Sequence, residues 1–523
     1  MRFLFSGRRK PHLNLRVPHP SRLLRRVGSY DRTPLNFSFL GLFACATLLL
    51  SGCTVGPNYK RPTAPVPATW DVPEPFREAA PKDGVPKTSW WTIYHEDELN
   101  ALETDLLVAN QTLKLAVAHY NQARASAVVQ NATLFPTLGV APTAERLRYS
   151  QTRSTGSNFP VTAPITQNSW ALPFTVSYEV DLAGQRRRTI EAAQASFQAN
   201  AADLENMRLI LTAELAADYF SLRQLDTQIS LLNSTVEALQ KGLDLVNSRH
   251  KGGIASGLDV AQEETLLNTT RTQATLLKQQ RKQYEDAIAF LVGKPAPEFH
   301  IAARELAIEP PNLDTSLPSD LLERRPDIAE AEREMAVANA QIGIAKAAYY
   351  PSLQLYGQGG WNSADITKLF NAESGFWAIG ANLAQNIFTG GARRAQVQYT
   401  QAGYEASVAS YRGTVLNAFS EVQDDITGLA VLATASQSQA DAVAAAHRQL
   451  DIATSRYTGG LVNYLDVVSA QQIVLTDEQE AAIIQGQRLV TSVLLVKALG
   501  GGWDAASLSA VQVKPHLKDI VAP

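Results

Sequence analysis

The sequence has little cysteine and two long stretches without proline. Only Cys45 and Cys53 occur in 523 residues, so at most one disulfide bond is available and a disulfide-stapled fold is excluded. No proline lies between Pro173 and Pro295, or between Pro351 and Pro515. Because proline in a helix interior costs about 3 kcal/mol, these two tracts predict two sets of very long helices.

The sequence also lacks the common enzyme motifs. It contains no G-x-x-x-x-G-K-[ST], no H-E-x-x-H and no G-x-S-x-G. The run His95-Glu96-Asp97-Glu98 could suggest a metal site, but adjacent helical residues do not share a face. We therefore expect a solvated helix start there, no metal or other cofactor, and no enzymatic activity.

Basic residues are scarce outside the N-terminus. Residues 1–52 hold nine Lys and Arg and one acid, which leaves 38 basic and 49 acidic residues in the rest of the chain. A nucleic-acid-binding protein needs a basic face. The mildly acidic remainder excludes that class of partner.

The N-terminus has the pattern of an export signal. Residues 37–50 form a mostly apolar run after a basic stretch, which is the length of a signal-peptide core and too short to cross a bilayer. Leu50-Ser51-Gly52-Cys53 follows and resembles the bacterial lipobox, which implies a covalent lipid on Cys53. Thr54, rather than Asp, implies sorting to the outer membrane. An ordinary signal peptide that happens to contain a cysteine is the alternative.

The most informative positive feature is an internal duplication. Nine residues recur after an offset of 207, and they fall in the same order in both copies. The first copy holds Trp170, Gly184, Arg186, Arg187, Glu214, Arg249, Gly252, Gly253 and Asp259, and the second holds Trp377, Gly391, Arg393, Arg394, Glu421, Arg456, Gly459, Gly460 and Asp466. Such self-similarity indicates two large structural repeats around a common axis.

Each copy predicts helices and strands in the same order. In the first copy we expect helices over 97–134, 185–250 and 258–292. In the second copy we expect a helix that begins at 326, a helix over 391–457 and a helix that ends at 499. The first long helix has apolar residues at alternating steps of three and four, the spacing of supercoiled helices; they are Leu222, Leu225, Ile229, Leu232, Val236, Leu239, Leu243 and Val246. This heptad pattern alone leaves a simple coiled-coil rod open.

Alternating segments argue against a rod. Residues 172–182 place apolar side chains at every second position, and 377–384 repeat the pattern. Weaker partner strands begin at Leu138 and Leu353. Eleven residues are about the length of a tilted membrane-spanning strand. A bilayer does not tolerate open strand edges, and four strands are too few to close, so several chains must share one barrel.

Several motifs together resemble a known family, the outer membrane factors. These are the TolC-like exit ducts, and the nearest branch is the NodT type of outer membrane lipoprotein from RND-type tripartite efflux systems. The resemblance covers nearly the whole mature chain. The motifs that carry it are Val55–Tyr59 with Arg61-Pro62, Trp90-Trp91 with Asp97 and Leu99, Arg325–Ile328, Asn339–Gly343, Tyr350–Leu353, Tyr457–Val467 and Lys497–Trp503.

The resemblance implies an α+β membrane protein built as a homotrimer. Four strands per chain would form a 12-stranded outer membrane β-barrel, continued by a long periplasmic α-helical barrel. The chain then divides into a removed signal peptide (1–52), a lipidated extended tether (53–96), repeat 1 (97–293), an equatorial connector (294–325), repeat 2 (326–499) and a C-terminal equatorial tail (500–523).

The resemblance also implies two kinds of functional residue at the ends of the long helices. The exposed turns would contact the hairpin tips of a periplasmic adaptor through Gly252, Gly253, Ile254, Gly459, Gly460 and Leu461. The residues just after the second turn would close the periplasmic aperture, namely Leu465, Asp466, Ser469 and Gln472. Ordinary turn chemistry explains the glycines equally well, and ordinary helix packing is the alternative for Leu465. Ser469 and Gln472 replace the family's usual Asp and Arg.

The expected function is an outer membrane exit duct of a tripartite efflux pump. It would conduct small molecules passively from a periplasmic adaptor and an inner membrane pump to the exterior. Two alternatives stay open, a duct for type I protein secretion and a non-conducting structural lipoprotein that spans the periplasm. The lipobox favours efflux over secretion, and the amphipathic strands count against a structural rod.

Overall fold

The two repeats consist of helices of equal length. The computed structural model describes residues 54–64, 66–67, 89–148, 166–311 and 321–512. In it, α4 (Gln185–Lys251) and α8 (Ala392–Thr458) have 67 residues each, and α5 (Gly257–Leu291) and α9 (Tyr464–Ala498) have 35 each. The starts of both pairs are related by the same offset as the duplicated motifs. A 67-residue helix is roughly 100 Å long, so the turns that end α4 and α8 lie far from the strands that precede them.

The first helix of each repeat also recurs, although the first copy is interrupted. α3 (Gln111–Ala132) and α7 (Pro326–Ala347) have 22 residues each. The prediction of one helix over 97–134 is wrong, because α2 (Asp97–Ala109) ends before α3 at Asn110. The Asn110 side chain accepts from the Leu113 amide and donates to the Leu291 carbonyl, 2.8 and 2.7 Å away. This buried amide caps α3 and fixes the break.

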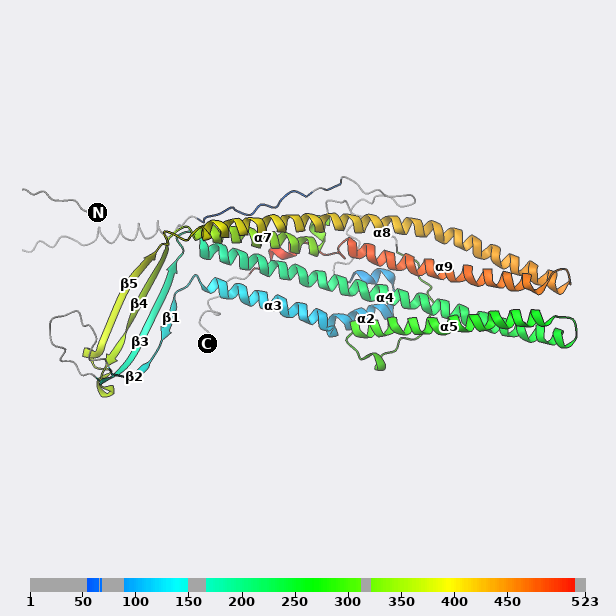
Figure 1. The fold of residues 1–523 in the computed structure, drawn as a ribbon, viewed down its shortest axis with the longest axis horizontal. Coiled ribbons are helices and arrows are strands. Elements are labelled where there is room, and N and C mark those ends of the chain that lie inside the picture. The colour runs from blue at the N-terminus through cyan, green and yellow to red at the C-terminus, as the bar shows by residue number, and fades with distance from the viewer. Residues whose placement is uncertain (1–53, 65, 68–88, 149–165, 312–320, 513–523) are drawn as a thin grey trace, which may run out of the picture. The chain divides into compact units, whose positions relative to one another are not determined.

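One antiparallel sheet contains all the described strands. Its order is β1 (Thr137–Val140) with β2 (Thr143–Arg148), then β3 (Thr166–Val180), β4 (Ser352–Ser363) and β5 (Gly375–Ala384) (Figure 1). β1 and β2 both pair with β3 in one continuous register, interrupted at Ala141-Pro142. The predicted strands are confirmed. Among the described strands, β5 and the β1–β2 strand have a neighbour on one side only.

One face of this sheet is exposed and apolar. Trp377, Ile379 and Leu383 of β5 are 79%, 82% and 63% exposed, and Phe174 and Val176 of β3 are also exposed. These residues occupy alternate positions, as a pleated strand requires. A face of this kind is what a lipid-facing barrel wall needs.

The helices pack laterally rather than around one compact centre. α4 contacts α3, α5, α7 and α9, whereas α8 contacts α7 and α9 (Figure 1). The predicted heptad seam is confirmed, since Leu222, Leu232, Leu239 and Val246 of α4 are fully buried or nearly so. The largest apolar cluster joins α2, α4, the segment near Phe299 and α9.

The remaining elements are short. They are η1 (Trp90–Tyr94), η2 (Ala296–Glu298), α6 (Leu321–Arg324), η4 (Ile366–Lys368), η5 (Ala372–Ser374) and α10 (Ala506–Ser509). Of the helices in the described part of the chain, none combines the length and the apolar character needed to cross a bilayer.

Candidate functional sites of the helical hairpins

The two turns between long helices have the same geometry. The helices end at the glycines predicted from the repeat, Gly252 and Gly459. The next residues, Gly253 and Gly460, have φ values of 72° and 71°, which a residue with a side chain adopts only at a cost. The amides of Ile254 and Leu461 each donate to the carbonyl five positions earlier, at 2.9 Å. Each turn is therefore a Schellman motif.

Both turns present an apolar side chain to solvent. Ile254 is 72% exposed and Leu461 is 73% exposed. A β-carbon added at Gly253 or Gly460 would meet no atom within 4 Å. The tips are therefore open surfaces, and the six predicted contact residues lie together in two equivalent places.

The four predicted aperture residues lie in the first turns of α9. All four are exposed, namely Leu465, Asp466, Ser469 and Gln472. The other side of the same turns is buried against α4 and α5 through Tyr464, Val467 and Val468. Leu465 is 52% exposed, so within one chain about half of this residue is open to solvent.

The aspartates that follow the two turns differ in their bonding. Asp259 accepts from the Ser256 amide at 2.9 Å, and the Ser256 hydroxyl accepts from the Asp259 amide at 3.2 Å. This capping box holds the start of α5. At the start of α9 the N-cap residue Asn463 makes no side-chain cap. Asp466 thus has no equivalent of the role that Asp259 performs.

A buried carboxyl group lies close to the start of α9, and no sequence motif predicts it. Glu263 of α5 is 0% exposed, and its carboxyl group interacts with the Tyr464 hydroxyl of α9. The Glu263 carboxylate and the Tyr464 hydroxyl both border Gly242 of α4. Burial raises the pKa of Glu263 and favours its neutral form. In the sequence Glu263 cannot be told from its exposed neighbour Glu264.

The segment after Cys53 is bound to the helices along its described part. Cys53 and the predicted signal peptide lie outside the described residues. The Val55 amide donates to the Ala183 carbonyl at 3.1 Å, between β3 and α4. Arg188 of α4 donates to Asn58 at 2.9 Å, and Tyr59 donates to Glu332 of α7 at 2.6 Å. Thr54 and Val55 therefore lie next to the junction of strands and helices.

The prediction of a solvated helix start at residues 95–98 holds for the exposed His95 and Asp97 and is wrong for Glu96 and Glu98. Glu96 is largely buried, pairs with Arg304 and accepts from the Tyr219 hydroxyl at 2.8 Å. Glu98 pairs with Arg223, whose side chain is 1% exposed. These partners come from distant parts of the chain, so the sequence run itself could not reveal them. The pairs tie the segment near Arg304 to α2 and α4.

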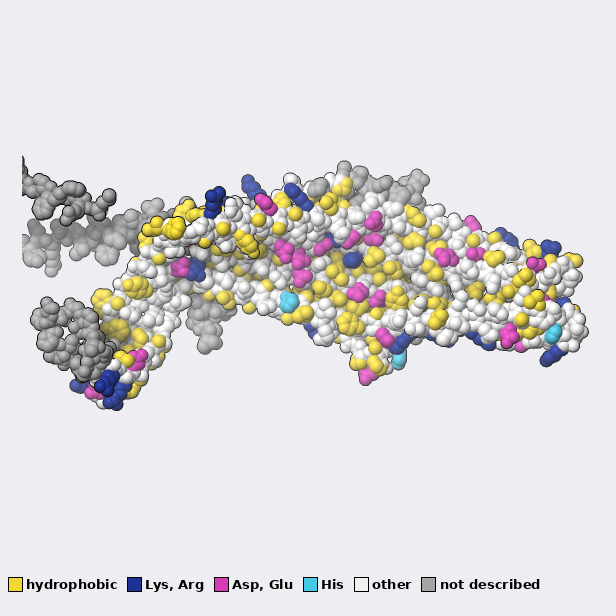
Figure 2. All heavy atoms as spheres, viewed as in Figure 1, with side chains coloured by type: hydrophobic (Ala, Val, Ile, Leu, Met, Phe, Trp, Pro, Cys, Tyr) yellow, Lys and Arg dark blue, Asp and Glu magenta, His cyan; other side chains and the backbone are white. Residues whose placement is uncertain are grey.

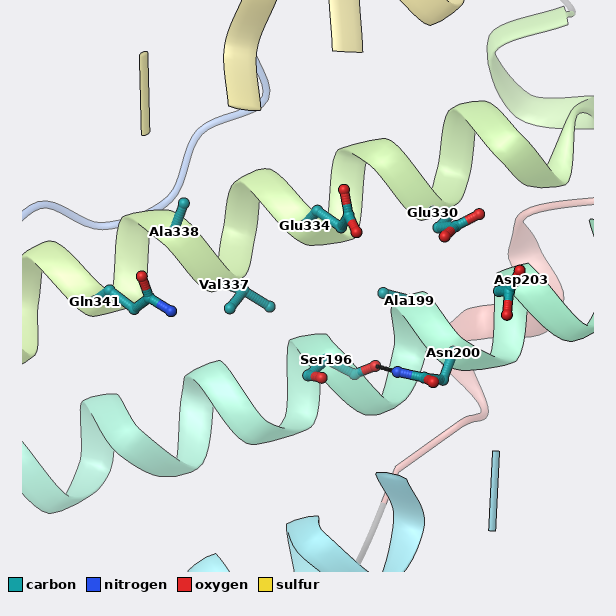
Figure 3. Close-up of a pocket in the computed structure, with 9 residues that line it drawn as sticks. All are labelled: Ser196, Ala199, Asn200, Asp203, Glu330, Glu334, Val337, Ala338 and Gln341. Carbon is teal, nitrogen blue, oxygen red and sulfur yellow. Dashed lines mark hydrogen bonds between the residues drawn. The ribbon is translucent and has the colours of Figure 1, made fainter. Parts of the chain in front are cut away.

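A group of carboxylates lines a cavity between α4 and α7. The cavity has a volume of about 380 Å³ and is bordered by Asp203 and Asn200 of α4 and by Glu330 and Glu334 of α7 (Figure 3). Burial, followed by the charge of Asp203, raises the pKa of Glu330 to about 7. Acidic side chains gather in the middle of the face seen in Figure 2.

A second acidic pair occurs once in each repeat. Glu214 and Asp218 of α4 recur as Glu421 and Asp425 of α8. Burial together with the neighbouring glutamate raises the pKa of Asp218 to about 6 and that of Asp425 to about 7. The middle of the helical region therefore carries carboxyl groups that titrate close to neutral pH.

The two-repeat architecture agrees with a family comparison. The model of the family described as "Outer membrane efflux protein" matches residues 102–294 and 317–501. The chain belongs to the outer membrane efflux protein family. It is a transport protein with the α+β fold of that family, a set of strands joined to long helices, and it is an outer membrane channel rather than an enzyme.

Relatives within the outer membrane efflux proteins cover nearly the whole chain. The probable efflux pump outer membrane protein SepC of Pseudomonas putida is 32% identical over 473 residues, which are 88% of this chain and 96% of SepC. The pyoverdine export outer membrane protein OpmQ of Pseudomonas aeruginosa is 32% identical over 470 residues, with the same coverage. The solved Campylobacter jejuni outer membrane channel CmeC shares the fold, with a TM-score of 0.79 at 23% identity over 87% of this chain and 96% of CmeC.

Proposed function

We propose that this channel is a homotrimeric exit duct of a tripartite efflux pump, which conducts small molecules passively to the exterior. The observation that carries the proposal is the sheet. It has one exposed apolar face and two edge strands, β5 and β1–β2. Within a bilayer both edges need partners, and three copies of a four-strand sheet would give a barrel of twelve strands. The long helices of the three chains would continue it as an α-helical barrel through the periplasm.

Lipidation of Cys53 would anchor each chain at the periplasmic face of the outer membrane. Support comes from the binding of Val55 beside Ala183, because this contact places the segment that follows Cys53 where β3 ends. An acyl chain on Cys53 would therefore enter the bilayer at the depth at which the strands leave it. Cys53→Ala should abolish metabolic palmitate labelling and leave assembly intact, because strand pairing closes the barrel. Labelling of the Cys53→Ala variant would overturn the assignment.

The exposed turns fit a periplasmic adaptor as the partner. Two open tips per chain, each with a solvated apolar side chain at Ile254 or Leu461, would give six equivalent tips in a trimer. Such a surface suits a six-fold partner, which in turn would bind an inner membrane pump. The names of the relatives, which mention efflux pumps, favour this assembly over type I secretion.

The aperture would be closed by the exposed residues at the start of α9. Three copies of Leu465 meeting at the tip would exclude water, and a hydrophobic constriction closes a pore by dewetting. Asp466 would add a ring of carboxylates that attracts cations. Its lack of a capping role is consistent with that function.

Conductance tests the proposal directly. The purified protein in planar bilayers should show little current, and Leu465→Ser should show a steady one. A protein that assembles but conducts in neither form would be a structural lipoprotein, not a duct. Retention of a hydrophobic dye in cells that lack their own exit duct, with and without a cognate adaptor and pump, then separates small-molecule efflux from protein secretion.

A further inference from the structure

Three strands of the sheet each carry a tryptophan on the exposed apolar face. Directly opposite residues of paired strands share a face. Trp170 belongs to β3 itself, and Trp361 of β4 lies opposite Leu172 of β3. Trp377 of β5 lies in line with Phe174 of β3, across β4. Measured along β3, the tryptophans therefore step by two positions from one strand to the next.

A step of this size keeps residues of tilted strands at one depth in a membrane. Neighbouring strands lie about 4.8 Å apart, and a tilt of about 40° requires a shift of about 4 Å along the strand. That shift is between one and two residues, and only an even step keeps the same face. Tryptophan is enriched where a membrane meets water. Trp170, Trp361 and Trp377 therefore mark one interface, at the end of the sheet farther from the helices (Figure 1).

An arginine takes the next position of this series. The step from β3 to β2 leads to Asn168, and the residue opposite Asn168 is Arg146. The duplication gives the same position, because the shift that aligns α3 with α7 maps Arg146 onto Trp361. Arg148 lies two residues further out, about 5 Å along the bilayer normal. The headgroup layer outside the hydrocarbon core is about 5–8 Å thick, so both guanidinium groups reach the headgroups.

The two arginines are the basic half of a polar block. Arg146 lies opposite Asn168, Arg148 lies opposite Thr166, and all four residues are exposed. Glu145 belongs to the other face of β2, and in the outer part of the described strands the apolar face holds no acidic residue. Figure 2 shows Lys and Arg side chains gathered at this end of the sheet. The block therefore presents positive charge and hydrogen-bond donors to the headgroups.

We infer that Arg146 and Arg148 bind a phosphate group of lipid A, the phosphorylated glycolipid of the outer leaflet. A guanidinium group matches a phosphate with two parallel hydrogen bonds. Two positions on one face of a strand are about 7 Å apart, so both long side chains converge on one phosphate. Asn168 and Thr166 supply further donors from the neighbouring strand.

The position of the block selects the lipid. The inference rests on the proposed function, because it needs the sheet to be a barrel wall with its free end towards the exterior. That end lies in the outer leaflet, where lipid A rather than phospholipid supplies the phosphate. The acyl chains of the same molecule would lie against the apolar face below the block, beside Trp170 and Leu172.

Lipid binding to the purified oligomer in detergent tests the inference. Native mass spectrometry with added lipid A, in the presence of EDTA, measures binding that needs no bridging divalent cation. We expect the unmodified protein to bind lipid A, and Arg146→Gln with Arg148→Gln to weaken binding by at least about tenfold. Arg146→Lys with Arg148→Lys retains the charge without the planar fork and should show an intermediate loss.

The matched control removes the same charge far from the strands. Lys241→Gln with Lys278→Gln changes two exposed bases of α4 and α5 and should bind lipid A like the unmodified protein. Dephosphorylated lipid A should bind weakly and equally to all variants. Phosphatidylglycerol, a single phosphodiester, should bind more weakly than lipid A to the unmodified protein.

Four results would overturn the inference. They are full lipid A binding by the glutamine pair, an equal loss in the control, equal binding of dephosphorylated lipid A, and equal binding of phosphatidylglycerol. If the glutamine pair does not assemble, the lysine pair carries the test, and unchanged affinity there would contradict the contact. Light scattering of the unmodified protein separates the two levels. A monomer would count against the barrel of the proposed function, whereas an oligomer that binds no lipid A would count against this inference alone.

Discussion

The long helices α4 and α8 have equal lengths and equivalent ends but very different burial. α4 buries 22 of its residues and α8 buries ten. The reason is the position of each helix in the fold. α4 packs against helices of both repeats, whereas α8 has only α7 and α9 beside it among the described helices. The exposed side of α8, with Tyr399 and Leu416, is therefore the side that is available to another chain. Equivalence of sequence does not imply equivalence of environment.

In the proposed function the residues after the second turn close the aperture and those after the first do not, and a matched pair of substitutions tests this difference. Leu465→Ser should open the aperture, from almost no current to a steady one, and should sensitise cells to vancomycin. Leu258→Ser changes the equivalent residue, which is 67% exposed at the start of α5, and should change neither. Equal leakage from both variants would mean that both hairpins line the aperture. A steady current that is the same in the unmodified protein and in Leu465→Ser would place the aperture elsewhere.

The turns, by contrast, should behave alike. Gly460→Pro cannot adopt the φ of 71° and loses the hydrogen bond from its amide to the Tyr457 carbonyl, at a local cost of about 3 kcal/mol. We expect reduced cross-linking to the adaptor with the global melting transition nearly unchanged, because the turn is open to solvent. Gly253→Pro should produce the same loss. Retained efflux with unchanged cross-linking would argue against docking at the tips.

The carboxylates between α4 and α7 predict that the stability of the protein depends on pH. Because the pKa of Glu330 is raised to about 7 from 4.5, the folded state retains its proton over this interval. The stabilisation is complete below about pH 4.5 and is lost as the pH rises through 7. In the Glu330→Gln variant the melting temperature should change less between pH 4.5 and pH 7. The difference from the unmodified protein corresponds to about 1–2 kcal/mol of unfolding free energy after solvent screening.

The control for this experiment is Glu237→Gln, which changes an exposed carboxylate of α4. It should leave the pH profile as in the unmodified protein. If the melting temperature of the unmodified protein does not change with pH, ionisation of Glu330 does not destabilise the fold. If the pH dependence of the melting temperature is the same in Glu330→Gln, it arises from other groups such as Asp425.

The smallest expected difference concerns the two aspartates after the turns. Asp259→Ala removes one half of the capping box with Ser256 and should destabilise the protein by about 1 kcal/mol. Asp466→Ala should leave the melting temperature unchanged and reduce cation selectivity in bilayers. An equal loss of stability in both variants would show that Asp466 has a structural role despite the missing cap.

Much of this architecture could be predicted from the sequence because repetition reveals it. The Pro-free tracts, the heptad of Leu222 to Val246 and the alternating strands each follow from local periodicity, and the constant offset between the repeats adds their order. The break at Asn110 could not be predicted, since it depends on a hydrogen bond to Leu291, which is 181 positions away in the chain. The pairing of Glu98 with Arg223 was missed for the same reason.

The candidate site residues also form two groups, those that a sequence pattern predicts and those that it does not. The turn glycines and the positions after them are visible as duplicated motifs, and the structure places them on open surfaces. Glu263 and Glu330 have no motif, and their unusual environment arises where distant helices meet. Local patterns identify residues at ends and turns, whereas the seams depend on packing between distant segments.

The identical lengths of α4 and α8 restrict which insertions and deletions the sequence can accept during evolution. One residue inserted into α8 would lift its tip by about 1.5 Å and rotate everything beyond it by about 100° relative to the unaltered α4. An insertion is then tolerated only if the same change is made in the other repeat. Length variation is therefore confined to places that the matched helices do not constrain. One such place is the strand hairpin of each repeat, since the segment between α3 and α4 is longer than the segment between α7 and α8.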